Sequence, residues 1–227
     1  WMGLCVMAYK KNAEMRKNIL EATKHVVGEN GYAKTAIKDV ADYLGVPRSL
    51  VCYYFKNKES IMQVLFREAY QVVEQVVSTV LPRGQEPMVR LMLKYLMYRR
   101  MILLNSLFIE FVVASEFATL DVSASADQIE RYYSDSRDAF VYRGKPVDGK
   151  EFRIHVRMVE GVGRAMVVGE YYGTIKLDDR EFMECLGKYA IMPTFDLTKK
   201  EMEEILDRTF VLAELIEKSR MDESAGA

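Results

Sequence analysis

Residues 44–60, LGVPRSLVCYYFKNKES, gather cationic and hydrogen-bonding side chains in a short stretch that contains a glycine turn. Arg48 can make two parallel hydrogen bonds to the edge of a guanine base, and Ser49 stands beside it. Tyr53, Tyr54 and Lys58 follow at positions where phosphate groups would run. The segment therefore has the chemistry to contact a polyanion, with only a few residues available to read a base sequence.

The elements that must position these residues are three short helices. Apolar residues recur at helical spacing between about residues 12 and 29, and Asn30-Gly31 offers the left-handed residue that ends such a helix. Thr35 is expected to cap a second helix that stops at Gly45, and a third helix is expected at about residues 47–55. This is the layout of a helix-turn-helix, which leaves the outer face of the third helix free to enter a major groove. From spacing alone, an ordinary three-helix core is the alternative.

The rest of the chain also shows helical periodicity, so we predict an all-α protein. Asn57 can cap a fourth helix, and Thr198 with Glu201 forms a capping box for the last one. Breakers at 143–150 and 192–196 separate most of the later helices, which are expected at about 87–104, 106–117, 125–141, 151–175, 179–190 and 199–220. The predicted division is a helix-turn-helix DNA-binding domain at 8–56 (motif at about 36–55), a connecting helix at 57–81, a ligand-binding and dimerisation domain at 82–221, and flexible tails at 1–7 and 222–227.

The composition fits a packed domain, with 50% hydrophobic and 29% charged residues and a net charge of −1. Residues 1–60 contain ten Lys and Arg against six Asp and Glu, whereas the remainder has an acidic excess, so the basic front is a weak hint of nucleic acid. The three cysteines show no metal-binding spacing and favour a reducing, cytoplasmic location. No run of 18 uncharged apolar residues occurs, so no membrane span is expected.

The ordered motifs of residues 18–62 resemble the amino-terminal domain of the TetR-type transcriptional repressor family. In order and spacing, they include Ile-Leu-x-Ala, Gly-Tyr, T-x-x-x-D-V-A, the Gly-Val turn and Y-F-x-N-K-E. Pro47, Leu50 and Cys52 depart from the residues that are usual in the family, and Leu50 can instead contact a thymine methyl group. The resemblance implies that DNA contacts come from Thr35, Lys38, Pro47, Arg48, Ser49, Leu50, Tyr53, Tyr54 and Lys58.

Residues 151–175 predict a helix that is apolar on two faces. One face is a ridge almost without side chains, formed by Gly161, Ala165, Gly169 and Gly173. A helix apolar on two faces must be buried on both, so we expect a second subunit to pack on this ridge. The last helix is expected to share the interface through Met202, Ile205, Thr209, Leu212 and Ile216. A wholly internal helix in a monomer is the alternative.

Residues 92–142 are rich in Met, Tyr and Phe, with a few polar groups among them, which suits an apolar ligand cavity. Ordinary core packing is the alternative, and for His155 a hydrogen-bonded core or interface position is favoured. The candidate cavity residues are Tyr95, Arg99, Phe108, Glu110, Phe111, Tyr132, Tyr133, Phe140, His155 and Met166.

Together with the resemblance, these features imply a homodimeric repressor that a small, largely apolar ligand releases from a palindromic operator in double-stranded DNA. Two alternatives are an activator and a regulator controlled by a protein partner or by no effector. The sequence contains only two histidines and no nucleophile-and-base motif. We therefore expect no enzymatic activity, no cofactor and no metal.

Overall fold

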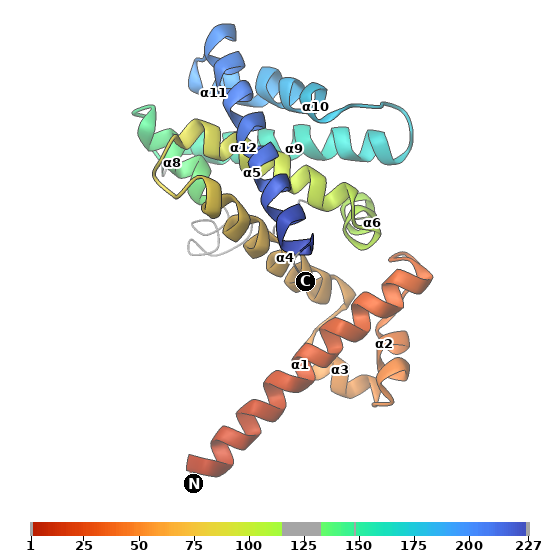
Figure 1. Ribbon diagram of the computed structural model, residues 1–227. Helices are drawn as coiled ribbons and strands as arrows, with labels where there is room; N and C mark the ends of the chain where they lie inside the picture. The colour runs from red at the N-terminus through yellow and green to blue at the C-terminus, as the bar shows by residue number, and fades with distance from the viewer. Residues whose placement is uncertain (1, 115–132, 148, 226–227) are drawn as a thin grey trace.

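The computed structural model describes residues 2–114, 133–147 and 149–225, and the regular secondary structure in these ranges is entirely helical (Figure 1). An amino-terminal group of three helices is joined through one long helix to a larger helical domain. This confirms the predicted fold class. None of the described helices has an apolar stretch long enough to cross a membrane.

The amino-terminal domain contains α1 (Met2–Asn30), α2 (Ile37–Leu44) and α3 (Arg48–Tyr54). Ile19, Val40 and Val51, one from each helix, are at most 1% exposed and belong to the hydrophobic core. Gly31 follows α1 and Gly45 follows α2, both with positive φ (79° and 65°), as the glycine pattern predicts.

The first helix is longer than expected and begins at Met2, so residues 2–7 of the predicted tail are helical. Residues 2–7, MGLCVM, contain no proline and include one Leu and two Met, which are good helix formers. The predicted cap of the second helix is wrong. Ala36 occupies the N-cap position, and the carboxylate of Asp39 accepts its backbone N–H at 2.7 Å. The hydroxyl of Thr35 instead donates to the carbonyl of Gly31 at 2.9 Å.

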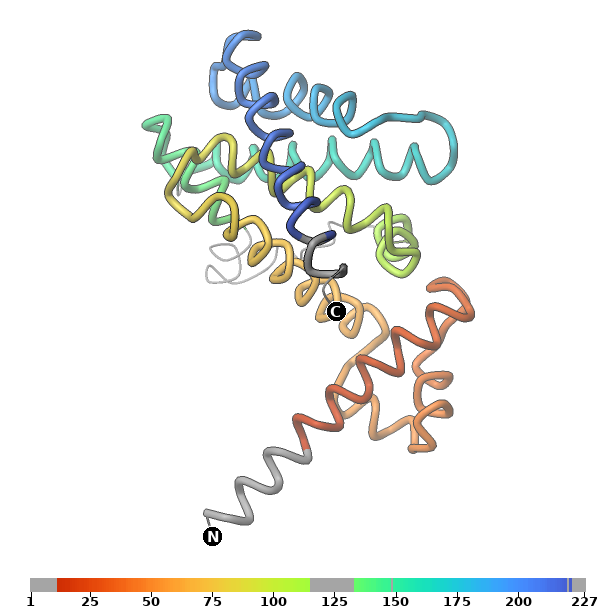
Figure 2. Tube along the Cα trace, viewed as in Figure 1, coloured from red at the N-terminus to blue at the C-terminus, as the bar shows by residue number. Residues whose placement is uncertain are grey.

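Helix α4 (Lys58–Val80) leaves the amino-terminal domain and runs into the second one (Figure 2). As predicted, Asn57 caps it by accepting the Ser60 backbone N–H at 2.9 Å. The second domain adds the helices α5 (Pro87–Leu103), α6 (Ser106–Ala114), α8 (Ser134–Tyr142), α9 (Lys150–Tyr171), α10 (Asp179–Leu186), η1 (Gly187–Ile191, a π-helical turn), α11 (Met192–Phe195) and α12 (Lys199–Ala225).

Helix α5 is the centre of the second domain, and α4, α6, α8, α9, α10 and α12 all contact it. Leu91, Met92 and Leu93 point in different directions around α5, and each is at most 2% exposed. A helix buried on every side must be covered by other helices on every side. The cavity described below lies against this helix.

Several predicted boundaries differ from the structure. No break occurs at residue 192, because η1 and α11 keep the chain helical until Asp196, whose φ of 52° ends the run. Pro193 lies in the first turn of α11, directly after the π-helical turn η1. The last helix continues to Ala225, so residues 222–225 of the predicted tail are helical. Residues 115–117 and 125–132 of two predicted helices lie outside the described residues.

Candidate DNA-binding surface and ligand cavity

The outer face of α3 consists of Arg48, Ser49, Cys52 and Tyr53, all of which are exposed. These residues lie on one side because their spacing matches the turn of a helix. Val51 on the opposite side is fully buried and attaches α3 to the domain core. The structure therefore presents the predicted base-reading residues to solvent on a short, anchored helix.

The other residues predicted to contact DNA have more varied surroundings. Lys38 and Pro47 are exposed, and Leu50 is half-buried. The hydroxyl of Tyr54 donates to the side-chain oxygen of Asn12 at 2.5 Å, which ties α3 to α1. Thr35 is only 3% exposed, so its side chain is part of the core rather than the outer surface.

Lys58 holds the turn between α1 and α2 against the start of α4. Its ammonium donates to the carbonyl of Tyr32 at 2.6 Å and lies 3.9 Å from the centre of the Tyr32 ring. Burial lowers the pKa of Lys58, and the nearby carboxylates of Glu59 and Asp39 oppose this shift. Burial together with Glu59 raises the pKa of Tyr32.

The same turn is attached to the second domain through α6. The backbone N–H of Tyr32 donates to Glu110 at 2.5 Å, and the Tyr32 ring packs edge-on against Phe111 at 5.5 Å. Phe66 of α4 packs on Phe108 and Phe111. Glu110, Phe108 and Phe111, which were predicted to line a ligand cavity, therefore form the junction between the two domains.

A cavity of about 150 Å³ lies among α4, α5, α6, α8, α9 and α10. Six aromatic side chains form much of its wall: Phe66, Tyr70, Tyr95, Tyr98, Tyr133 and Phe182. The charged and hydroxyl groups of the wall are Lys94, Arg99, Asp135, Ser136, Glu160 and Arg164. A largely apolar space with a few polar groups is the usual form of a small-molecule site.

Three residues predicted for the cavity, Tyr95, Arg99 and Tyr133, do line it. Phe140 and His155 instead pack together elsewhere, with ring centres 5.2 Å apart. Met166 is buried and is not part of the cavity wall. Tyr132 lies outside the described residues.

His155 is a core residue, 1% exposed, as the sequence favoured. Its Nδ1 lies 3.2 Å from the Thr194 hydroxyl, which itself donates to the carbonyl of Ala190 at 2.7 Å. The hydroxyl proton is therefore used, so Nδ1 carries the proton and donates to Thr194. Burial lowers the pKa of His155 to about 4, which keeps the imidazole neutral at pH 7.

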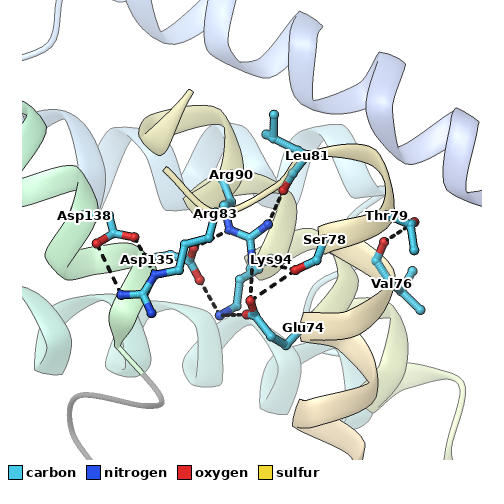
Figure 3. Close-up of polar contacts among 10 residues, drawn as sticks. All are labelled: Glu74, Val76, Ser78, Thr79, Leu81, Arg83, Arg90, Lys94, Asp135 and Asp138. Atoms are coloured by element: carbon cyan, nitrogen blue, oxygen red, sulfur yellow. Dashed lines mark hydrogen bonds and ion pairs between the residues drawn. The ribbon is translucent and has the colours of Figure 1, made fainter. Parts of the chain in front are cut away.

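A buried ionic cluster connects the cavity wall to α4 (Figure 3). Arg90, 1% exposed, donates to Asp135 at 2.7 Å and also bonds Glu74 and the carbonyl of Leu81. Lys94 lies between the carboxylates of Glu74 and Asp135. Two cations and two carboxylates balance one another, which is how charges are tolerated in a protein interior. The cluster links the end of α4 with α5 and α8.

Glu160 of α9 is a carboxylate of the cavity wall with one oxygen that has neither a hydrogen bond nor an ion pair among the described residues. One of its oxygens accepts the hydroxyl of Tyr133, whereas the other, Oε2, is buried without a hydrogen-bond partner among the described residues. Burial raises the pKa of Glu160, and the Tyr133 hydrogen bond and Arg157 only partly offset this. The hydroxyl of Tyr98 is likewise buried and has no hydrogen-bond partner in the described ranges.

Sequence reasoning missed most of this wall, including Phe66, Tyr70, Tyr98, Glu160 and Phe182. A usable signal existed for two of them. Tyr70 lies on the apolar stripe of α4 that also carries Phe66, and Glu160 directly follows Val159 on the inner stripe of α9. A carboxylate at the border of a buried stripe is unusual unless it has a partner.

The predicted dimer face is only partly free. Gly161 and Ala165 are exposed, and a Cβ added at Gly161 would meet no atom within 4 Å. A Cβ at Gly169 would come within 2.9 Å of Ile175, so the chain's own turn covers that position. Gly173 lies beyond the end of α9, with a φ of 69°. The ridge is therefore shorter than predicted.

The residues of α12 that were assigned to the dimer interface pack inside the subunit. Helix α12 contacts α5 and α4, and Ile205 is half-buried against the core. The other four are at most 4% exposed: Met202, Thr209, Leu212 and Ile216. This part of the prediction is wrong because an apolar stripe shows that a face is buried, but not which partner buries it.

Residues 19–65, which span α1 to α4, match the family described as bacterial regulatory proteins of the tetR family. The chain carries the amino-terminal domain of the TetR-type regulators. This TetR-type domain is 40% identical over 50 residues to the fatty acid metabolism regulator protein of Bacillus subtilis. It is 31% identical over 58 residues to the HTH-type transcriptional regulator TtgR of Pseudomonas putida.

These two matches cover 22% and 26% of this chain and only 26% and 28% of the relatives. The fold likeness extends further than the TetR-type domain. RolR, solved in complex with resorcinol, superposes with a TM-score of 0.58 at 14% identity, covering 83% of this chain and 94% of that chain. The comparison shows that the two proteins share an all-helical, two-domain fold. Within the described residues, no group of three His, Cys, Asp or Glu side chains is placed to hold a metal ion.

Proposed function

We propose that this protein is a dimeric DNA-binding transcriptional regulator that reads its operator with α3. The observation that supports this best is the exposed face of α3, where Arg48 and Ser49 stand free on a helix anchored by the buried Val51. Arg at the start of such a helix can bond a guanine edge, while the neighbouring polar residues contact phosphates. The TetR-type domain of residues 19–65 supports the same function.

The regulator acts as a repressor that a small ligand releases from DNA. Helix α4 supports this because it touches both sites: Phe66 and Tyr70 line the cavity, and Lys58 holds the turn at Tyr32. A ligand that favours another position of α4 changes the spacing of the two recognition helices in the dimer. Its effect on DNA affinity is at most the difference between its affinities for the two positions of α4. The cavity itself argues against a regulator without an effector.

The second subunit packs on the exposed stripe of α9. Ile154 and Met158 are 45% and 37% exposed, and Gly161 and Ala165 continue the same stripe. Their spacing of three and four residues places them on one side of the helix. Two subunits related by a two-fold axis then place two α3 helices on half-sites about one DNA turn apart.

The direct test is binding to the DNA that flanks the coding region, measured by fluorescence anisotropy and footprinting. We expect Arg48→Ala to lose about 1–3 kcal/mol of operator binding and to relax the base preference at one position of each half-site. Lys200→Ala, an 87% exposed lysine at the start of α12, is the matched control and should bind like the wild type. Unchanged binding by Arg48→Ala would show that α3 does not read the operator.

A further inference from the structure

Among the charged side chains of the described cavity wall, Glu160 has a buried oxygen with neither a hydrogen bond nor an ion pair. Three other charged side chains of the wall form ion pairs. Lys94 and Asp135 pair with each other and with Glu74 and Arg90, respectively. Arg99 pairs with Glu170 and Asp179, although its Nε is buried without a hydrogen-bond partner among the described residues. Arg164 also has an interaction partner. Glu160 Oε2 has no hydrogen-bond partner among the described residues, although the atom is buried. An unpaired buried carboxylate oxygen costs free energy that a donating or cationic ligand can recover.

The aromatic residues around Glu160 suit a cation more than an anion. Two rings of this wall already face cations of the protein: Lys94 lies 4.8 Å from the centre of Tyr70, and the Arg99 guanidinium lies 4.8 Å from that of Phe182. The ring faces carry negative partial charge, so they stabilise a positive group. The buried hydroxyl of Tyr98 provides a further oxygen that can accept a hydrogen bond.

The size of the cavity limits the ligand. The cavity volume of about 150 Å³ is that of an apolar cavity which accepts a molecule the size of benzene. Gly163 contributes to the space because a Cβ there would lie 4.0 Å from Phe182, an ordinary contact. A larger side chain at Gly163 would therefore extend into the cavity rather than displace the backbone.

From this geometry we propose that the cavity binds a small organic cation, a protonated amine on a single-ring apolar body, with its ammonium against Glu160. This inference rests on the proposed ligand response of the second domain. Glu160 accepts a hydrogen bond from the ammonium, and the aromatic wall covers the apolar body. Tyr133 keeps the carboxylate in place from the other side.

Three ligands of nearly equal shape test the proposal: benzylamine, benzyl alcohol and ethylbenzene, titrated by calorimetry at pH 7. We expect benzylamine to bind at least tenfold more tightly than benzyl alcohol, and ethylbenzene to bind most weakly. Glu160→Gln should reduce the affinity for benzylamine at least tenfold and change that for ethylbenzene less than twofold. Glu151→Gln, an exposed carboxylate on the same helix, is the matched control and should bind all three like the wild type.

Two further measurements complete the test. Gly163→Leu should weaken all three ligands because it fills the cavity, and benzoate should bind more weakly than benzylamine. Any one of four results would overturn the proposal. These are tighter binding of benzoate or benzyl alcohol than of benzylamine, equal binding of all three ligands, no binding of benzylamine, and an unchanged affinity for benzylamine in Glu160→Gln. Operator binding without ligand is measured separately. If the protein binds DNA but not the amine, only this inference is overturned. If the amine binds through Glu160 but the protein does not bind DNA, only the proposed regulator function is overturned.

Discussion

Arg48 and Lys58 belong to the same short stretch of sequence, yet the fold gives them different neighbours. Arg48 is exposed on α3, whereas Lys58 is half-buried and bonded to the turn at Tyr32. A cation that is already hydrogen-bonded within the protein has less freedom to reach a phosphate. Lys58 therefore combines two tasks: it stabilises the amino-terminal domain, and in our proposal it strengthens DNA binding without reading bases.

Lys58→Ala should accordingly lower both stability and DNA affinity. Loss of a charge-assisted hydrogen bond and of the contact with the Tyr32 ring should reduce the free energy of unfolding by about 1–2 kcal/mol. Affinity should fall equally for all DNA sequences, and the salt dependence should become weaker. Urea denaturation and anisotropy measure the two effects. Lys56→Ala, an exposed neighbour, should leave stability unchanged; a similar loss in both variants would contradict the role given to Lys58.

His155 should make the stability depend on pH. Its pKa is about 4 in the folded protein, against an ordinary value of 6.5. Between these values the unfolded chain binds more protons, so stability is complete above pH 6.5 and falls by up to about 3 kcal/mol as the pH drops to 4. Urea denaturation from pH 7 to 4 should show this loss in the wild type but not in His155→Phe. Identical pH profiles of stability for the two proteins would show that His155 does not cause the loss.

At the scale of elements, α4 is the helix that links the two sites. Its first residue, Lys58, touches the amino-terminal domain, its middle lines the cavity through Phe66 and Tyr70, and Glu74 joins the ionic cluster. The Arg90, Lys94 and Asp135 side chains of the cluster are at most 3% exposed, so the strength of the cluster decides how firmly the end of α4 is held to α5 and α8.

Asp135→Ala should therefore be strongly destabilising. It leaves Lys94 and Arg90 buried with one carboxylate, Glu74, between them. Breaking a buried ion pair from one side typically costs about 3–5 kcal/mol, which urea denaturation measures directly. Asp138→Ala on the same helix removes only a contact with the 55% exposed Arg83 and should cost less than about 1 kcal/mol. Equal losses in the two variants would argue against the cluster as the main link.

At the scale of the whole molecule, the proposed function depends on two surfaces. One is the exposed stripe of α9, and the other is the junction where Tyr32 meets Glu110. In our proposal, the first sets the distance between the two recognition helices of the dimer, and the second transmits a change in the cavity domain to the DNA-binding domain.

Gly161→Arg should convert the proposed dimer to a monomer. The side chain has open space in a single subunit, so the fold should persist while the second subunit is excluded. Sedimentation velocity measures the association state, and operator affinity should fall with it. Glu214→Arg, on the exposed face of α12, is the control and should remain dimeric. A monomer in the control and a dimer in Gly161→Arg would place the interface on α12.

Glu110→Gln should weaken the communication between the sites while leaving each site intact. It removes the negative charge that accepts the Tyr32 N–H, but it touches neither α3 nor the cavity wall. We expect operator and benzylamine affinities within about threefold of wild type, and a decrease of about 0.5–2 kcal/mol in the coupling between them. Anisotropy titrations with and without benzylamine give this coupling. An unchanged coupling free energy would show that Glu110 does not contribute to the communication between the cavity and the DNA-binding domain.

Much of the local structure was determined by the sequence alone. Four such features depend only on residues within one helical turn of each other, so the local sequence suffices to predict them. They are the helix ends at Gly31 and Gly45, the Asn57 cap and the Thr198–Glu201 capping box. The exposed face of α3 could also be predicted from the sequence. Once one residue of a helix is known to be buried, the residues on the opposite side of that helix must face the solvent.

Only the tertiary structure decided which apolar helical faces pack against each other. The face of α12 was correctly expected to be buried, but it packs on α5 and α4 of its own subunit. Glu110 lies at the domain junction and Glu160 in the cavity, although both are carboxylates bordering apolar helical faces. Periodicity measures how much of a helix avoids water, whereas the identity of its neighbour depends on contacts between residues far apart in the chain.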